Sequence, residues 1–137
     1  MSIPRVLVVD DHPDTLGLFE AFLTLDGFQV VTAANAVDGL RHASESVDAV
    51  VTDLAMPGMD GTEFVRCLRA RGSRSIPILA VTGQAIDHVP LTREQIDCCR
   101  VLQKPVDVRH LADTLRFLID NCAHDCARCP LRVERLS

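Results

Sequence analysis

The stretch RVLVVDDHPD, residues 5–14, decides the fold class of this chain. Its first half is a continuous apolar run that ends in two aspartates, Asp10 and Asp11. An apolar run without alternation is typical of a strand buried on both faces of a parallel sheet. Residues 13–25 follow with apolar side chains at helical spacing, and Gly27 is a stop signal. The stretch therefore predicts a buried strand, two carboxylates at its end, and a helix.

The same alternation continues along the chain. Four more strand-like runs lie at residues 28–33, 48–53, 76–83 and 99–103, and helical spacing marks residues 36–46, 62–71 and the segment from about Val106 onward. Pro90 disfavours a helix interior, so we expect only a short helix from about Thr92. Strands alternating with helices predict an α/β fold with a doubly wound, five-stranded parallel sheet and helices on both faces.

Length and composition restrict the class of protein. The chain has 137 residues, 47% of them hydrophobic and 24% charged, with a formal net charge of −5 and scattered basic residues. This length fits one domain with its own core. Without a long apolar segment, a leader pattern or a basic cluster, we expect a soluble, cytoplasmic protein that binds neither nucleic acid nor membrane.

Polar side chains follow the predicted strands at the point where each strand ends. Asp10 and Asp11 follow the first, Asp53 ends the third, Thr82 lies in the fourth and Lys104 follows the fifth. Carboxyl ends of parallel strands meet at one edge, so these groups should converge there. Clustered carboxylates need a cation, and oxygen ligands suit Mg²⁺. A carboxylate beside a divalent ion, a lysine and a hydroxyl is equipped to attack a phosphoryl group, which makes Asp53 the candidate nucleophile.

The sequence also resembles a known family, the receiver domain of bacterial two-component response regulators. The matching pieces are VLVVDD at 6–11, VVTDLAMPGMDG at 50–61, AVTG at 80–83 and QKP at 103–105, and the resemblance covers about residues 4–121. It implies a flavodoxin-like fold in which Asp53 accepts a phosphoryl group from a phosphohistidine of a histidine kinase or phosphotransfer protein.

The resemblance also implies residue roles. Asp11, the Asp53 carboxylate and the main-chain carbonyl of Ala55 would hold Mg²⁺, and Asp10 would act mainly through bound water. By contrast, we interpret His12, beside the acidic pair, as a solvated or loop-packing histidine.

The same resemblance implies roles for Thr82 and Lys104. Thr82 and Lys104 would bind the phosphoryl oxygens, and the bond before Pro105 would be cis. The chain departs from the family at Val101, where receivers usually carry an aromatic side chain that moves on activation. Phosphorylation is expected to remain while its readout differs.

Three functional hypotheses follow. The leading one is a stand-alone receiver, residues 1–121, that signals by phosphorylation-dependent binding to a downstream protein or acts in a phosphorelay. The second is a Mg²⁺-dependent aspartate phosphatase, which would need a general acid at the position of Ala55 and is disfavoured for that reason. The third is a receiver-like interaction module that takes no phosphate.

The tail, residues 122–137, contains Cys122, Cys126 and Cys129. With His124 they have the ligand types of a zinc site, and a disulfide is a further alternative. Their spacing, however, continues a helical stripe that begins at Val108 and runs on through Val133. We interpret the tail as an extension of the last helix, with a short second helix from Pro130, and expect a homodimer through it.

Overall fold

The structure is a computed structural model that describes residues 3–43, 46–56, 58–59, 61–71, 76–83, 100–121 and 132–134. One parallel sheet has the order β2-β1-β3-β4-β5-β6. The strands are β1 (Arg5–Val9), β2 (Gln29–Ala33), β3 (Ala49–Asp53), β4 (Ile78–Thr82), β5 (Arg100–Gln103) and β6 (Arg132–Glu134). The helices are α1 (Pro13–Leu25), α2 (Ala36–Ala43), α3 (Gly61–Ala70) and α4 (Val108–Asn121).

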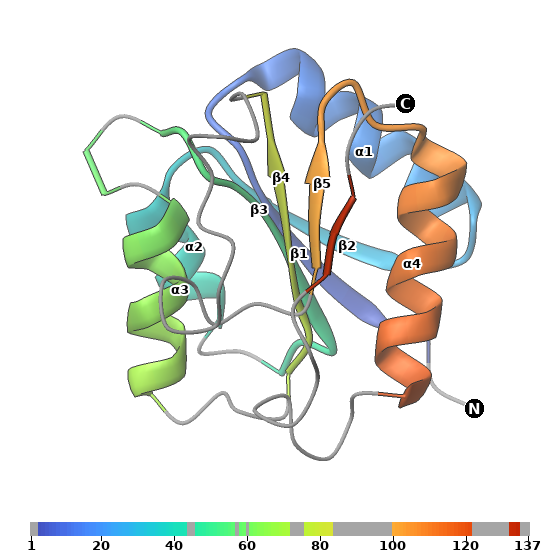
Figure 1. The fold of residues 1–137 in the computed structure, drawn as a ribbon. Coiled ribbons are helices and arrows are strands. Elements are labelled where there is room, and N and C mark those ends of the chain that lie inside the picture. The colour runs from blue at the N-terminus through green and yellow to red at the C-terminus, as the bar shows by residue number, and fades with distance from the viewer. Residues whose placement is uncertain are drawn as a thin grey trace.

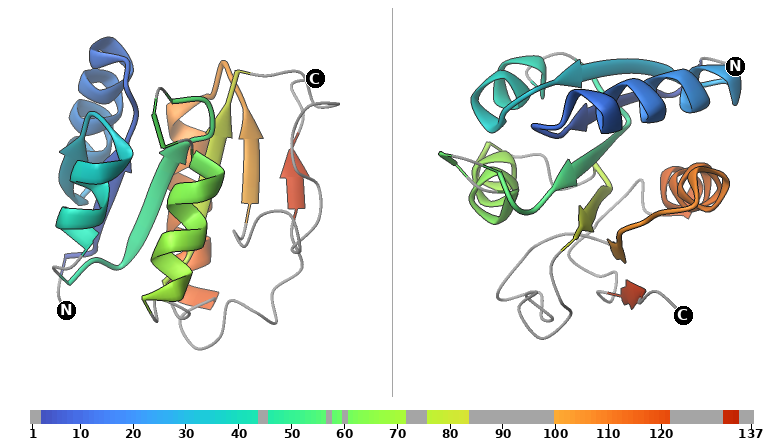
Figure 2. Two further views of the ribbon diagram at one scale, coloured as in Figure 1. Left: turned by 90° about the vertical axis from the view of Figure 1, so that its left-hand side faces the viewer. Right: turned by 90° about the horizontal axis from the view of Figure 1, so that it is seen from above.

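Helices cover both faces of the sheet, as Figures 1 and 2 show. Alternate residues of each central strand enter different cores: Leu7 packs with α2 and α3, whereas Val8 packs with α1 and α4. All five residues of β3 and of β4 are buried, which explains their unalternating apolar sequences. The predicted α/β class and the five predicted strands are therefore confirmed, and the sheet has a sixth strand, β6, beside β5.

The end of α1 shows how local sequence sets the chain's direction. Gly27 has a φ of 99°, a conformation that favours glycine because it has no Cβ. The amide of Phe28 donates to the Leu23 carbonyl at 2.9 Å and that of Gly27 to the Thr24 carbonyl at 3.2 Å, the two bonds of a Schellman motif. Phe28 is thereby buried and leads directly into β2.

The topology brings β1 and β3 together at the centre of the sheet, where the strand order reverses. Val9 pairs with Thr52, so the residues that follow β1 lie beside the last residue of β3. Ligand sites in such sheets lie at the carboxyl ends of strands where the order reverses. The fold therefore places Asp10 and Asp53 at the position where a site is expected.

Two sequence predictions differ from the structure. The sequence predicts the third helix over residues 62–71, but α3 begins and ends one residue earlier, at Gly61 and Ala70. Val133 was expected on a helical stripe. Instead α4 ends at Asn121, and residues 132–134 form β6, parallel to β5 with Val101 opposite Val133. An extended helix is therefore wrong for these three residues, because the available sheet edge offers backbone hydrogen bonds that the local pattern does not reveal.

Other predictions fall outside the described residues: the short helix near Thr92, and the cysteines and His124 of the tail. The dimer through that tail stays a prediction. Among the described residues, no helix has both the length and the apolar character that crossing a membrane requires.

Candidate functional site

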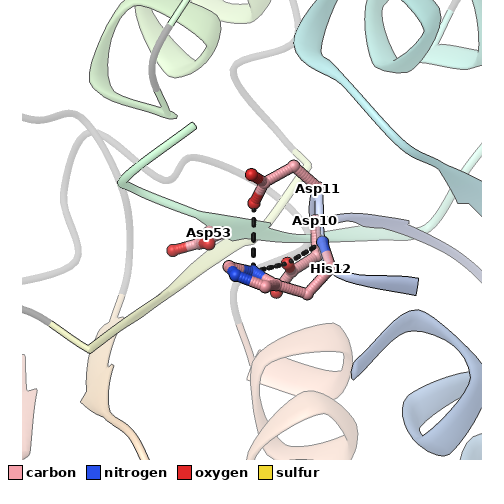
Figure 3. A group of neighbouring side chains, drawn as sticks. All are labelled: Asp10, Asp11, His12 and Asp53. Atoms are coloured by element: carbon pink, nitrogen blue, oxygen red, sulfur yellow. Dashed lines mark hydrogen bonds and ion pairs between the residues drawn. The ribbon is translucent and has the colours of Figure 1, made fainter. Parts of the chain in front are cut away.

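Three carboxylates and a histidine gather at the carboxyl ends of β1 and β3 (Figure 3). Asp10, Asp11 and His12 follow β1, and Asp53 ends β3. One ligand atom from each of the four lies within 4.8 Å of the others, and among the described residues this is the group that could hold a metal ion. The predicted convergence of Asp10, Asp11 and Asp53 is confirmed in the geometry.

Lys104 approaches the cluster from β5. Its amide donates to the Thr82 carbonyl at 2.7 Å, and the peptide bond to Pro105 is cis, as predicted. Its Nζ lies 3.1 Å from Asp10 Oδ2 and 3.5 Å from Asp53 Oδ2. The side chain of Lys104 thus connects the ends of β1, β3 and β5. Thr82 is fully buried and contacts Lys104 through the main chain.

Asp53 is held in a buried position, with 4% of its surface exposed. The Ala55 amide donates to Asp53 Oδ1 at 3.2 Å. Burial raises the pKa of the Asp53 carboxyl, and the charge of Lys104 and the Ala55 amide partly offset this rise, while Asp10 adds to it. A cation at this point would favour the ionised form that a nucleophile requires.

The segment after β3 is anchored against α3. The Leu54 amide donates to the Val81 carbonyl at 3.2 Å, and the Gly61 amide donates to the Leu54 carbonyl at 2.9 Å. A Cβ at Gly61 would lie only 2.0 Å from the Asp53 carbonyl oxygen. Only glycine lets the helix approach the strand end so closely, which fixes the segment that carries Ala55.

The two aspartates after β1, Asp10 and Asp11, differ in their hydrogen-bond partners. Asp10 Oδ1 accepts a hydrogen bond from the His12 amide at 2.9 Å, and its other oxygen contacts Lys104. Asp11 Oδ1 is buried and accepts no hydrogen bond. His12 Nδ1 lies 3.1 Å from this oxygen, an ion pair when the imidazole is protonated, but not with the geometry of a hydrogen bond.

These observations fit a divalent cation. Among the described residues, three carboxylates against one ammonium, that of Lys104, leave two negative charges uncompensated. The Asp11 oxygen without a hydrogen bond needs a positive partner, because an unpaired buried charge is costly. The donors are mainly hard oxygen atoms, which Mg²⁺ prefers.

The sequence predicted the positions of the three aspartates and Lys104, but not the contacts of His12 with the acidic pair. The His12 side chain is 66% exposed, as a solvated histidine should be, yet its Nδ1 turns toward both aspartates. Its backbone is extended, with a φ of −94° and a ψ of 113°, the conformation favoured before proline. The adjacent Pro13 was the available signal. The Ala55 amide contacts Asp53, whereas a metal-binding role for its carbonyl stays a prediction.

Comparisons with known proteins agree with this geometry. The family model of the response regulator receiver domain matches residues 6–116. The transcriptional regulatory protein PrrA of Mycobacterium tuberculosis is 42% identical over 86 residues, 62% of this chain and 36% of that protein. AruR of Pseudomonas aeruginosa, also a transcriptional regulatory protein, is 30% identical over 128 residues, 89% of this chain and 52% of that protein. The chain thus spans about a third to a half of the length of these curated relatives.

Solved structures give the same answer. A response regulator receiver domain protein from Clostridium thermocellum superposes with a TM-score of 0.78 at 27% identity, covering 86% of this chain and 95% of that one. The match to the family model, over residues 6–116, includes the acidic cluster and Lys104. The chain belongs to the family of response regulator receiver domains.

Proposed function

We propose that Asp53 accepts a phosphoryl group from a phosphohistidine of a histidine kinase or a histidine phosphotransfer protein. One observation carries this proposal: the Asp53 carboxylate lies next to both the Lys104 ammonium and the acidic pair, at the point where the strand order reverses. A carboxylate in that setting has the cation and the neighbouring acids that phosphoryl transfer uses. Signalling by phosphorylation is the general role of the family to which the chain belongs.

The unequal partners of the acidic pair support separate roles for its members. Asp10 already accepts hydrogen bonds on both oxygens, which favours contact with Mg²⁺ through bound water. Asp11, with an oxygen that accepts none, would bind the ion directly, together with Asp53 and the Ala55 carbonyl. When bound, the ion supplies positive charge that neutralises the phosphoryl oxygens.

In the transfer, the protein mainly positions the reacting groups and neutralises their charge. An Asp53 carboxylate oxygen attacks phosphorus, the bond from phosphorus to the donor imidazole nitrogen breaks, and that nitrogen keeps the electron pair and takes up a proton. Lys104 already contacts Asp53 Oδ2, so its ammonium is placed to follow the charge onto the phosphoryl oxygens. Thr82 would add a hydroxyl donor from the neighbouring strand.

We further propose that the chain phosphorylated on Asp53 signals in the cytoplasm by binding a downstream protein or by passing the phosphoryl group along a relay. A phosphatase of the aspartate-nucleophile type would need a proton donor two residues after Asp53. Ala55 supplies only a methyl group there, so rapid enzymatic turnover is not expected.

Intact-mass measurement after incubation with acetyl phosphate and Mg²⁺ tests the proposal. The wild-type protein should gain the mass of one phosphoryl group, and Asp53→Asn should gain none. Asp48→Asn is the matched control, because this exposed carboxylate precedes the same strand at its opposite end. Labelling that persists in Asp53→Asn, or fails in wild type, contradicts the proposal.

A further inference from the structure

The least expected feature of the acidic cluster is the direction of the His12 ring. Its Nδ1 lies 3.2 Å from Asp10 Oδ1 and 3.1 Å from Asp11 Oδ1, while the side chain remains 66% exposed. Asp10 and Asp53 are each only 3% exposed in their side chains. The ring therefore forms the solvent-facing wall of a cluster whose other members lie deeper.

The position of this ring does not depend on helix capping. His12 occupies the N-cap of α1, yet its side chain makes no cap hydrogen bond. Its extended backbone precedes Pro13, which restricts the residue before it to extended conformations. The chain thus holds the imidazole at the strand end.

Hydrogen bonding explains why His12 Nδ1 lies close to Asp10 Oδ1, but not why it lies equally close to Asp11 Oδ1. With the proton on Nδ1, the ring donates to Asp10 Oδ1, and Asp11 Oδ1 is left without a hydrogen bond although the same nitrogen lies 3.1 Å away. With the proton on Nε2, the Nδ1 lone pair faces both carboxylate oxygens, an arrangement that is unfavourable without a cation among them. A cation beside Nδ1 would satisfy both the ring nitrogen and Asp11 Oδ1, while Asp10 Oδ1 keeps its hydrogen bond from the His12 amide.

The spacing of these atoms is that of a ligand set. In an octahedral site with ligands at about 2.1 Å, neighbouring ligand atoms lie about 3.0 Å apart and opposite ones about 4.2 Å apart. The 3.1 Å from His12 Nδ1 to Asp11 Oδ1 matches neighbouring positions, and one ligand atom from each of the four residues fits within 4.8 Å. A neutral imidazole nitrogen is a ligand that first-row transition metals accept more readily than Mg²⁺ does.

We propose that His12 is a direct ligand of the divalent ion and shifts the preference of this site from Mg²⁺ toward a first-row transition-metal ion, with Mn²⁺ as the probe. The inference rests on the divalent site of the proposed function and adds a nitrogen donor to its oxygen ligands. The chain would then take up its phosphoryl group with a different resident ion where both metals are present.

Paired titrations with Mg²⁺ and Mn²⁺ test this inference on the full chain. In wild type, bound Mn²⁺ should show the electron-spin-echo modulation of a coordinated ¹⁴N nucleus. His12→Ala should abolish that modulation and reduce the ratio of Mg²⁺ to Mn²⁺ dissociation constants roughly tenfold. His12→Gln should behave like His12→Ala, because its amide can donate to Asp10 but offers no nitrogen lone pair.

His42→Ala removes a histidine of α2 outside the cluster and should match wild type in both measurements. All variants keep the cysteines, so metal bound by thiols cancels in the comparison. If Mg²⁺ and Mn²⁺ bind but His12→Ala keeps the wild-type ratio, or wild type shows no nitrogen modulation, the inference is wrong and the proposed function stands. If His12→Gln keeps the Mn²⁺ preference, His12 acts only through hydrogen bonding. If neither ion binds, the divalent site itself is refuted.

Discussion

Substitution of Gly61 by alanine should disturb the site without changing any side chain that is proposed to bind metal or phosphate. A Cβ at this position would lie 2.0 Å from the Asp53 carbonyl oxygen and 2.6 Å from the Leu54 Cα. Both atoms belong to the backbone, so no flexible side chain can move aside. The strand itself cannot yield easily, because β3 is paired with β1 on one side and β4 on the other.

The size of the disturbance follows from the contact distances. The separation of 2.0 Å must grow to an ordinary 3.4 Å, so the start of α3 and the segment before it must shift by about 1.4 Å. The hydrogen bond from the Ala55 amide to Asp53 Oδ1, 3.2 Å long, would not survive such a shift. We expect a loss of about 1–3 kcal/mol in the free energy of unfolding. The phosphorylation rate should fall about 100-fold.

Urea denaturation and the rate of phosphorylation by acetyl phosphate measure the two effects. Gly17→Ala is the matched control, because a Cβ at this position in α1 meets nothing within 4 Å. It should gain about 0.5–1 kcal/mol of stability and keep the wild-type rate. Leu115 belongs to α4 and lies in the core. Leu115→Ala should lower the free energy of unfolding by about 2–5 kcal/mol, yet the folded protein should keep the wild-type phosphorylation rate. The reasoning is refuted if Gly61→Ala matches wild type in both stability and rate.

Three further predictions concern charge. Burial raises the pKa of Asp53, so the native state of the metal-free protein keeps this proton to higher pH than the unfolded chain does. Asp53→Asn should therefore stabilise the protein above about pH 4, by an amount that grows until the pH passes the native pKa and is constant beyond it, and should have no effect at lower pH. Urea denaturation with chelator measures this effect. Lys104→Met removes the ammonium that contacts Asp10 and Asp53; calorimetry should show tighter Mg²⁺ binding, and mass spectrometry slower phosphorylation. Arg116→Ala removes an ion pair with Asp26 and a contact 4.5 Å from the centre of the Phe28 ring, and should cost about 1 kcal/mol by urea denaturation while the phosphorylation rate stays unchanged.

The strands were predictable because their burial leaves a direct trace in the sequence. A strand covered on both faces is apolar at every position, so residues 6–9 and 49–51 could be assigned without any neighbour. The stop at Gly27 was equally local, since its positive φ favours glycine. Local patterns of this kind predict an element and its ends, but they do not say what a sheet edge will pair with.

The strand β6 illustrates this limit. Val133 fits a helical stripe and a strand equally well, because a single apolar residue in a short segment has no periodicity to read. The pairing of Val133 with Val101 depends on where the edge of β5 lies in the folded sheet. A three-residue strand is therefore decided by its partner across the sheet and not by its own sequence.

The apolar runs of the sequence show that Asp10, Asp11, Asp53 and Lys104 lie at the ends of strands, and parallel strands bring these ends to one edge. The contacts among these residues depend on the folded sheet. Lys104 and Asp10 are 94 residues apart, and their 3.1 Å contact depends on the strand register. The position of His12 before Pro13 is evident in the sequence, whereas the rotation of its ring is not. That rotation is decided by the two carboxylates it faces, which lie together only once the sheet has formed.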